Sequence, residues 1–447
     1  MNISLLISKL YLFSIFAVLV FLFIFTNDSF NYDFLVLFSS FIICIISLYN
    51  IFSSKQYPYS LNLITHLFFL FFFGLAPSLQ FKQDSFFWNG FTLSKHNYLY
   101  GNLMIIIIQF FYILIYNFKV NSSLFKFFVE KLDFNIRVPK FKVVTICIFS
   151  ILIFFYLKDF NLLSIFFRGG YKESAEQGVK LNSSLTLIIN FFIRPIPLVC
   201  LIYYKSINQS SKFSFFELFL ILASLFSNFP AGMPRFQAAA LYIPVLIVYF
   251  RVFSKNYAFA LFFCLGLLII FPFLSQFRDL DKLNDNIGID LTMFSDENFD
   301  TYQNTVNVIS MNEVTNGSQL LGTLLFFVPR SLWPSKPYSS GEYFANKYNY
   351  DFSNISLSFF GEGFINFGYV GVFLFTIVLA LMHSFIDKCY WWNYTTINVK
   401  FSVLFKIFLG MQFFMLRGDL LNAFAYTVGL SLCVVFVSKF IFVYVPK

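Results

Sequence analysis

The chain has 447 residues, of which 58% are hydrophobic and only 12% are charged, and its mean hydropathy is +0.73. This composition excludes a soluble globular protein, which needs far more charge on its surface. The formal net charge of +9 comes from positive charges in the segments on one side of the membrane. It therefore indicates no nucleic-acid partner. Six Cys lie in or beside apolar runs without a CxxC spacing, and only three His occur. We therefore expect no disulfide framework, no metal site and no cofactor.

Apolar runs long enough to cross a bilayer recur along the whole chain, since a spanning helix needs about 20 such residues. The first run lacks a small-residue cleavage site and is expected to remain as a span. We predict an all-α polytopic membrane protein that forms a single transmembrane domain over residues 1–447, with about twelve spans. These spans are predicted at residues 5–25, 34–52, 61–81, 98–118, 142–160, 185–204, 214–230, 236–252, 257–275, 357–386, 403–416 and 420–440.

The charges between these spans alternate in sign from one side to the other. The segments on the side of both termini hold 17 Lys and Arg against 4 Asp and Glu, and the opposite segments hold 13 against 18. Cationic loops stay in the cytoplasm. The sequence therefore predicts cytoplasmic N and C termini and places one long loop, residues 276–356, on the non-cytoplasmic side.

The long loop contains an apolar stretch of its own. Gln319–Val328 is too short to cross the membrane and stops at Pro329, so we expect a short interfacial or re-entrant helix there. Trp333 follows at a position that suits the headgroup boundary. The acidic stretch 279–300, upstream, is interpreted as solvated outer surface.

The arginines are concentrated on the outer side, where positive charge is otherwise disfavoured. Only Arg137 and Arg251 are cytoplasmic, and the outer segments hold five of the remaining arginines, with a sixth inside a span. Arginine binds phosphate or carboxylate with a planar fork of donors and keeps its charge. Either these residues bind an anionic, phosphorylated ligand or each pairs with a nearby acidic residue. The candidate residues for binding this ligand are Arg168, Arg194, Arg235, Arg278, Arg330 and Arg417.

Two of these arginines have a distinctive local setting. Arg235 follows Pro234 at the predicted outer start of a helix, where free backbone N–H groups favour an anion. Arg194 is predicted near the middle of the membrane, followed by Pro195 and Pro197. An intramembrane arginine is costly unless it has a partner. Either the carbonyls freed by the prolines satisfy it, or it faces a polar cavity open to the outer side.

Small and polar residues cluster at the outer start of the span 357–386. Glu362 and Asn366 lie four residues apart and share a helix face, among glycines that permit close helix packing. Glu362 either pairs with an arginine or accepts a proton from a sugar hydroxyl. Arg417-Gly418-Asp419 is predicted to form a tight outer turn between the last two spans, in which Asp419 orients Arg417 or contacts the ligand itself.

Three motifs, in this order, resemble those of the O-antigen polysaccharide polymerases of the Wzy type. They are Val328-Pro329-Arg330-Ser331-Leu332-Trp333-Pro334-Ser335-Lys336-Pro337, Gly361-Glu362-Gly363 with Asn366-Phe367-Gly368, and Arg417-Gly418-Asp419. The resemblance covers about the last third of the chain. The span number and the long late outer loop are also similar to that family.

The resemblance implies a metal-independent membrane glycosyltransferase. Such enzymes join oligosaccharide units carried on undecaprenyl pyrophosphate, at the outer face of the cytoplasmic membrane, by attack of a non-reducing-end hydroxyl on the growing chain. It implies catalytic roles for Glu362, Arg330 and Arg417, and substrate binding by Asn366, Asp419 and the other outer arginines. The expected partners are the lipid-linked glycan, the bilayer and a chain-length regulator.

Two alternatives remain open. An O-antigen ligase has similar spans and a late outer loop, but that family is expected to use a loop histidine, and residues 276–356 contain none. A lipid-linked oligosaccharide flippase is a transporter, and transporters tend to have two related halves, which this sequence does not show. The sugars, the linkage and the final polysaccharide are not determined by the sequence.

Overall fold

The computed structural model describes residues 3–26, 32–53, 57–88, 92–118, 134–158, 160–162, 165, 188–208, 213–270, 294–295, 297–392 and 398–446. The N-terminal half contains α1 (Ile3–Thr26), α2 (Phe34–Ser53), α3 (Leu61–Phe68), η1 (Phe69–Leu75), α4 (Ala76–Gln83), α5 (Lys95–Tyr116), α7 (Lys140–Leu157), η2 (Ile189–Ile193), α10 (Ile196–Ile207) and α11 (Phe215–Ser227). The C-terminal half contains α12 (Arg235–Tyr249), α13 (Ala258–Leu265), η5 (Gly266–Ile270), α15 (Thr301–Ser310), α16 (Ser318–Leu324), α17 (Ser340–Lys347), α18 (Phe359–Trp392), α19 (Val399–Arg417), α20 (Leu420–Phe436) and η9 (Val437–Ile441). Short 3₁₀ turns η3 (Pro230–Gly232), η4 (Arg251–Ser254) and η8 (Glu297–Phe299) complete the helical elements.

Eight helices of the described residues are long and apolar enough to cross a membrane. They are Lys9–Thr26, Phe34–Ser53, Leu61–Gln83, Lys95–Tyr116, Lys140–Leu157, Phe359–Trp392, Val399–Arg417 and Leu420–Ile441. A polytopic membrane protein made of helices is therefore confirmed. The larger number of spans stays a prediction, as does the side on which each loop lies.

The remaining predicted spans are shorter or interrupted. Spans 214–230, 236–252 and 257–275 contain the apolar helices Phe215–Ser227, Gln237–Tyr249 and Ala258–Ile269. Within the predicted span 185–204, of which residues 188–204 are described, the chain turns at Arg194–Pro195 between η2 and α10. Proline removes a helical hydrogen bond and clashes with the preceding turn, which explains the break.

One departure from an all-helical fold lies near the C terminus. Strand β1 (Phe134–Arg137) pairs in antiparallel fashion with β2 (Val443–Pro446), and Phe134 lies opposite Pro446. Both strands belong to segments predicted to be cytoplasmic. Two strands can pair only when they lie on the same side of a membrane, so this pairing agrees with the predicted topology.

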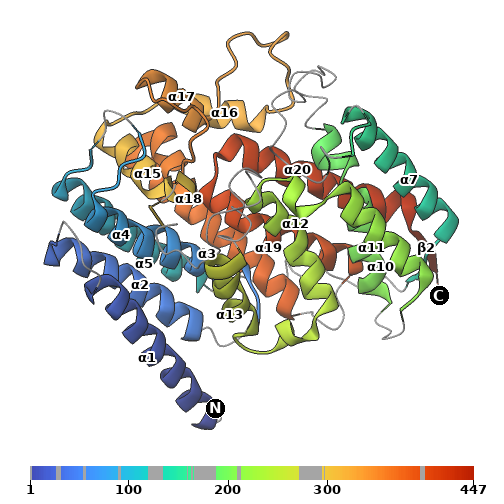
Figure 1. The fold of residues 1–447 in the computed structure, drawn as a ribbon, viewed down its shortest axis with the longest axis horizontal. Coiled ribbons are helices and arrows are strands. Elements are labelled where there is room, and N and C mark those ends of the chain that lie inside the picture. The colour runs from blue at the N-terminus through green and yellow to red at the C-terminus, as the bar shows by residue number, and fades with distance from the viewer. Residues whose placement is uncertain are drawn as a thin grey trace.

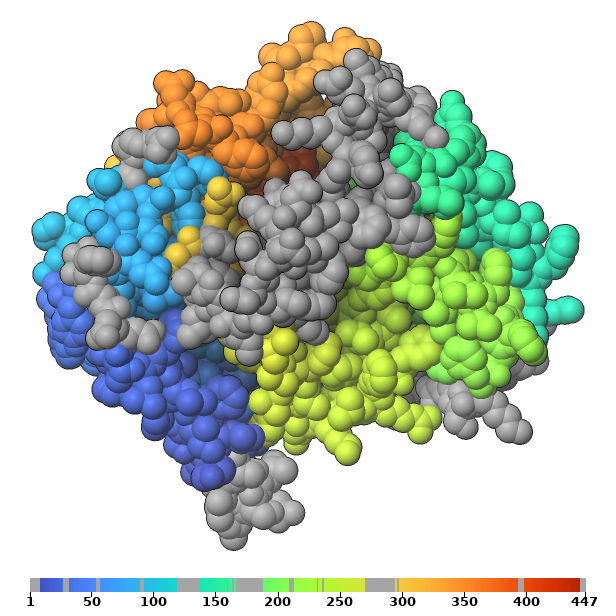
Figure 2. Space-filling model, in the orientation of Figure 1, coloured from blue at the N-terminus to red at the C-terminus, as the bar shows by residue number. Residues whose placement is uncertain are grey.

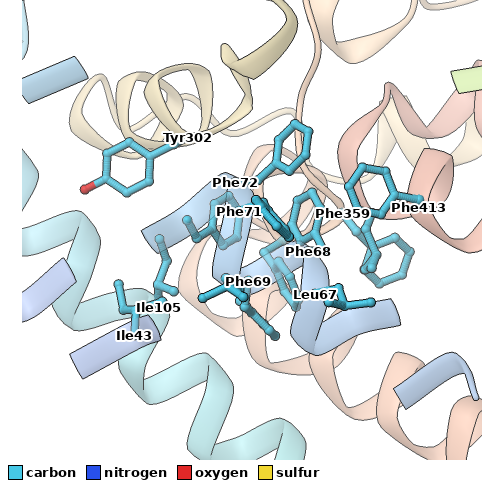
Figure 3. Close-up of a cluster of buried hydrophobic side chains, with 14 of the residues drawn as sticks. Ile43, Leu67, Phe68, Phe69, Phe71, Phe72, Ile105, Tyr302, Phe359 and Phe413 are labelled. Atoms are coloured by element: carbon cyan, nitrogen blue, oxygen red, sulfur yellow. The ribbon is translucent and has the colours of Figure 1, made fainter. Parts of the chain in front are cut away.

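The centre of the bundle is formed by α3, α5, α18 and α19, with α1 and α2 on one side and α7, α10 and α11 on the other (Figure 1). An aromatic layer fills this centre (Figure 3); we define it as Phe68, Phe69, Phe72, Phe360 and Phe413. The rings of Phe68 and Phe72 stack 5.1 Å apart, Phe69 and Phe360 stack 5.4 Å apart, and Phe72 meets Phe413 edge to face at 5.1 Å.

The described part of the long loop folds over one end of the bundle. Helices α16 and α17 lie along the upper edge of the molecule with α15 below them (Figure 1), and the orange atoms of this region cover the upper end in the space-filling view (Figure 2). The predicted apolar stretch Gln319–Val328 begins within α16 and continues as turns. Leu321, Leu324 and Phe327 are exposed there, which agrees with a segment that lies in the membrane interface.

Helix α18 is broken near the end of its first quarter, at Phe367 and Gly368. Phe367 and Gly368 leave the helical conformation, and Gly368 has φ +61° and ψ −147°, a region that only glycine enters readily. Gly363 and Gly371 lie on either side of the break, where a Cβ on Gly371 would come 1.9 Å from the carbonyl oxygen of Gly363. The break separates a short first segment, which carries Glu362, from the long second segment of the helix.

Candidate active site

The second and third motifs meet where α17, α18 and α20 begin. Glu362 is only 1% exposed. Its Oε2 accepts a hydrogen bond from the Ser340 hydroxyl at 2.6 Å, and its Oε1 accepts one from the backbone N–H of Leu420 at 2.9 Å. Among the arginines whose side chains the structure describes, none pairs with Glu362. A carboxylate at the first backbone N–H groups of α20 is stabilised by those orphan donors and by the helix dipole.

Asp419 is a second carboxylate at the same junction. It is the N-cap of α20 and accepts from the backbone N–H of Leu421 at 3.1 Å, while its other oxygen accepts from the N–H of Gly341 at 2.9 Å. Burial raises the pKa of Asp419, and these hydrogen bonds oppose that shift. Glu362 and Asp419 together fasten the start of α17 to the start of α20.

Gly341 is required by this arrangement. A Cβ at this position would lie 2.2 Å from the carbonyl oxygen of Ile355, which is closer than any real contact. The backbone N–H of Gly341 can reach Asp419 only because the chain passes so close to Ile355. The local sequence does not reveal this close approach, because it depends on a neighbour that is fourteen residues further along the chain.

Arg417 lies next to this junction, at the end of α19. Its Nε donates to the carbonyl oxygen of Asn298 at 2.9 Å, and an Nη atom lies 3.4 Å from Oδ1 of Asp300. The Arg417 side chain is 14% exposed, whereas that of Asp300 is 2% exposed. The predicted turn Arg417-Gly418-Asp419 is confirmed, but Asp419 accepts hydrogen bonds from Gly341 and Leu421 while Arg417 pairs with Asp300.

Asp300 was misinterpreted from the sequence as solvated surface. It accepts hydrogen bonds from the backbone N–H of Ser356 at 3.1 Å, from the Ser356 hydroxyl and from Asn304 Nδ2 at 2.9 Å. Asn304 in turn accepts from Trp88 Nε1 at 2.7 Å. Burial raises the pKa of Asp300, although Arg417 and the hydrogen bonds of Ser356 lower it. The remaining acidic residues of 279–296 lie outside the described residues.

Asn366 anchors the loop helix α16 to α18. Its Oδ1 accepts from the backbone N–H of Leu320 at 2.7 Å, and its Nδ2 donates to the carbonyl oxygen of Glu362 at 2.9 Å. Its own carbonyl oxygen accepts from the N–H of Gly317, a residue with φ +84°. The predicted shared face of Glu362 and Asn366 is therefore present. Asn366 contacts the start of α16, and Glu362, one helical turn earlier, contacts the start of α17.

Arg330 lies further out, in the turn after α16. It is exposed, and its guanidinium donates to the carbonyl oxygens of Lys336 and Pro337 while lying 4.1 Å from the centre of the Tyr338 ring. Lys336 closes the same turn by donating to the carbonyl oxygens of Phe326 and Val328. Arg330 thus organises the first motif, and its described contacts all lie within that turn.

Arg194 is buried at the break between η2 and α10. Its Nε donates to the carbonyl oxygen of Ser227 at 2.6 Å, and its guanidinium lies 4.4 Å from the centre of the Phe154 ring. Ser227 ends α11 and Phe154 lies in the last turn of α7. The guanidinium therefore lies close to the ends of both helices, while its predicted depth in the membrane stays a prediction. One Nη of Arg194 has no partner among the described residues.

The other predicted arginines are less fully placed. Arg235 begins α12 directly after Pro234, as predicted, but its side chain lies outside the described residues. Arg168 and Arg278 also lie outside them. Arg194, Arg330 and Arg417 are placed, and each makes its described contacts with a different part of the chain. No group of three or more metal-ligating side chains occurs among the described residues.

A further ion pair, missed by the sequence reasoning, holds the loop helices together. Glu313 accepts from Lys347 Nζ at 2.6 and 2.8 Å and from the hydroxyls of Tyr343 and Tyr348. Burial raises the pKa of Glu313, but these hydrogen bonds outweigh burial and hold the pKa below its ordinary value.

No known protein family, curated protein or solved structure matches the chain.

Proposed function

We propose that this protein is a polysaccharide polymerase that joins oligosaccharide repeat units carried on undecaprenyl pyrophosphate at the outer face of the bacterial cytoplasmic membrane. The observation that carries the proposal is that residues of two family-like motifs meet at one junction. Glu362 accepts from the N–H of Leu420, and Asp419 accepts from Gly341, which follows the first motif closely. Motifs far apart in the chain are thereby joined at the end of the bundle that the loop helices cover.

The proposed reaction is a displacement at the anomeric carbon of the growing chain. The non-reducing-end hydroxyl of a new unit attacks this carbon, the bond between it and the pyrophosphate oxygen breaks, and lipid pyrophosphate leaves. Arg417 is the placed arginine best suited to stabilise the leaving group, because it is partly exposed beside the junction. Glu362 takes the proton of the attacking hydroxyl. Because Ser340 occupies Oε2 of Glu362, this role requires the Ser340 hydroxyl to turn away.

An apolar groove supports a lipid-linked substrate. It runs between α1, α2, η1 and the α13–η5 helix, and every residue that lines it is apolar. Phe16, Val20, Ile51, Leu70, Leu268 and Phe294 are among these residues. Phe294 packs on Phe299 with ring centres 4.9 Å apart, and Phe299 directly precedes Asp300. Phe294 and Phe299 thus connect one wall of the groove to the Arg417–Asp300 pair, which supports a substrate with an isoprenoid tail and a pyrophosphate head.

The test uses purified full-length protein in liposomes with undecaprenyl-pyrophosphate-linked repeat units. The proposal predicts a ladder of lipid-linked products with increasing unit number. Transfer of glycan to a lipid A-core acceptor without a ladder would identify a ligase, and transbilayer movement of the unit without new linkages would identify a flippase. Either result would overturn the proposal. In cells, loss of the gene should leave single repeat units on the surface acceptor.

A further inference from the structure

A column of polar side chains lies between α5 and α18, far from the junction described above. The Tyr112 hydroxyl is 2.8 Å from Nδ1 of His383, and the Tyr116 hydroxyl donates to Asp387 at 3.0 Å. The two tyrosines are four residues apart, as are His383 and Asp387, so the two pairs lie one helical turn apart on facing sides of parallel helices. All four side chains are buried.

One end of the column reaches the end of the bundle where α3 begins and α5 ends. Asp387 accepts hydrogen bonds from the backbone N–H groups of Leu61 and Asn62 at 2.9 and 3.1 Å, so it caps α3. Lys388, the next residue, is partly exposed and donates to the carbonyl oxygen of Phe118 just beyond α5. This end of the bundle is the predicted cytoplasmic end.

The other end of the column contains polar atoms that lack partners. Both ring nitrogens of His66, Nε2 of His383 and Nε2 of Gln412 are buried without a hydrogen bond to any described residue. The His66 and His383 rings both lie edge-on to the Tyr112 ring, at 5.8 and 5.9 Å between ring centres. The side chain of Gln412 interacts with the His383 imidazole, although neither Nε2 atom makes a hydrogen bond of good geometry there. Three helices, α3, α18 and α19, thus direct unpartnered nitrogen atoms toward one place.

Leaving such atoms dry would be costly. A buried donor or acceptor without a partner loses its hydrogen bonds to water and gains none in return, and buried polar groups in native proteins are almost always bonded to protein or to water. A buried water makes about three hydrogen bonds. The two imidazoles and the amide together offer enough donors and acceptors to bind such a water. Polar residues that serve packing alone would be replaced by apolar ones at lower cost in a membrane.

The aromatic layer closes this place toward the loop helices. His66 is followed by Phe69, with ring centres 6.2 Å apart, and Phe69 stacks on Phe360. Gln412 is followed by Phe413, which packs on Phe68 and Phe72 (Figure 3). Beyond these rings, Phe72 stacks on Phe299, beside Asp300. The layer therefore separates the unpartnered nitrogens from the candidate active site.

We propose that His66, His383 and Gln412 form an internal site that binds water and, through it, a proton, with access from the Asp387 end of the bundle and closure by the aromatic layer at the other end. The titratable or charged groups that face this route are Tyr57 before α3, Tyr112 and Tyr116 from α5, Asp387 and Lys388 from α18, and Lys406 from α19. Lys406 donates to Ser402 within its own helix. The site is independent of the proposed glycosyl transfer.

The test is hydrogen exchange of the imidazole groups in full-length protein labelled with ¹⁵N-histidine and reconstituted in liposomes. The chain has only three His, so His66→Gln, His383→Gln and His96→Gln assign every signal. His96 is exposed and serves as the reference. The proposal expects cross-peaks between water and the ring nitrogens of His66 and His383, with exchange in D₂O within the experiment. Imidazoles that stay protonated in D₂O while His96 exchanges would overturn it.

A matched pair of variants tests the route. Tyr116→Phe removes one hydroxyl at the Asp387 end, and Tyr100→Phe removes one at the opposite end of the same helix pair, where Tyr100 donates to the hydroxyl of Tyr369 at 2.7 Å. Tyr116→Phe should slow exchange at His383 several-fold, and Tyr100→Phe should leave it unchanged. Unchanged exchange in Tyr116→Phe, or slowing by Tyr100→Phe alone, would contradict access from the Asp387 end.

Discussion

The Glu362→Gln variant tests whether this carboxylate takes a proton or only holds two helices together. Glutamine has nearly the same shape as glutamate. Its Oε1 can accept the N–H of Leu420, and its amide N–H can donate to the hydroxyl of Ser340, which then acts as an acceptor. Both contacts seen at 2.6 and 2.9 Å can therefore persist, but the side chain can no longer accept a proton from a sugar.

The expected magnitudes separate the two roles. Because both hydrogen bonds are retained, Glu362→Gln should change the free energy of unfolding by about 1 kcal/mol or less. Glu362→Ala leaves the Leu420 N–H and the Ser340 hydroxyl buried without an acceptor, at about 1–3 kcal/mol each, and opens a cavity as well. A lost general base lowers a rate by about 10²–10⁴-fold. Glu362→Gln should therefore be stable but inactive.

The assay combines thermal unfolding of the purified variants with the repeat-unit ladder in liposomes. Glu313→Gln is the matched control, because it neutralises another carboxylate of the same outer region that is bound by Lys347 instead. Its ladder should be normal. A Glu362→Gln protein with a ladder of normal length, beside an unfolded or inactive Glu362→Ala, would refute proton transfer by Glu362 and leave it a positioning residue.

Three further outcomes follow from other contacts. Arg417→Lys keeps the charge but loses the planar fork that reaches Asp300, so the ladder should be largely lost at unchanged protein level, and normal chain length would contradict a pyrophosphate clamp. The folded-state pKa of Glu313 lies below its ordinary 4.5, so its pairing with Lys347 stabilises the fold above that pH, and this contribution is lost as the pH falls through the folded value; unfolding curves of Glu313→Gln should lack this step. Val20→Trp fills the apolar groove and should weaken binding of a polyprenyl-phosphate probe in detergent, while unaltered binding would place the tail elsewhere.

The long helices were predictable because apolar length is a local property of the chain. The predicted spans 34–52, 61–81 and 420–440 agree with helices to within a few residues. The break at Arg194 was not predicted as a break, although Pro195 and Pro197 had been recognised. Pro197 lacks an N–H, and the carbonyl oxygen of Ile193 accepts the Ser150 hydroxyl instead. That replacement partner lies on another helix, so the sequence alone does not reveal it.

The candidate site was predictable in its members but not in its pairings. Glu362, Arg417 and Asp419 were singled out, and all three lie at the same end of the bundle. Their partners were missed because Asp300 and Ser340 have nothing unusual in their local sequence. Whether an acidic residue is solvated or buried depends on what folds over it. Here Ser356 and Asn304 cover Asp300, and both come from segments of the long loop.

The pairing of β1 with β2 has a consequence for the order of assembly. One strand comes from the first third of the chain and the other from its last residues. During synthesis from the N terminus, Phe134–Arg137 therefore stays without its partner until every helix between them has been made and inserted. The strand pair can close only around a completed bundle. Pairing of the two strands is therefore a late step of folding. A chain truncated before Val443 would keep its helices but could not form this strand pair.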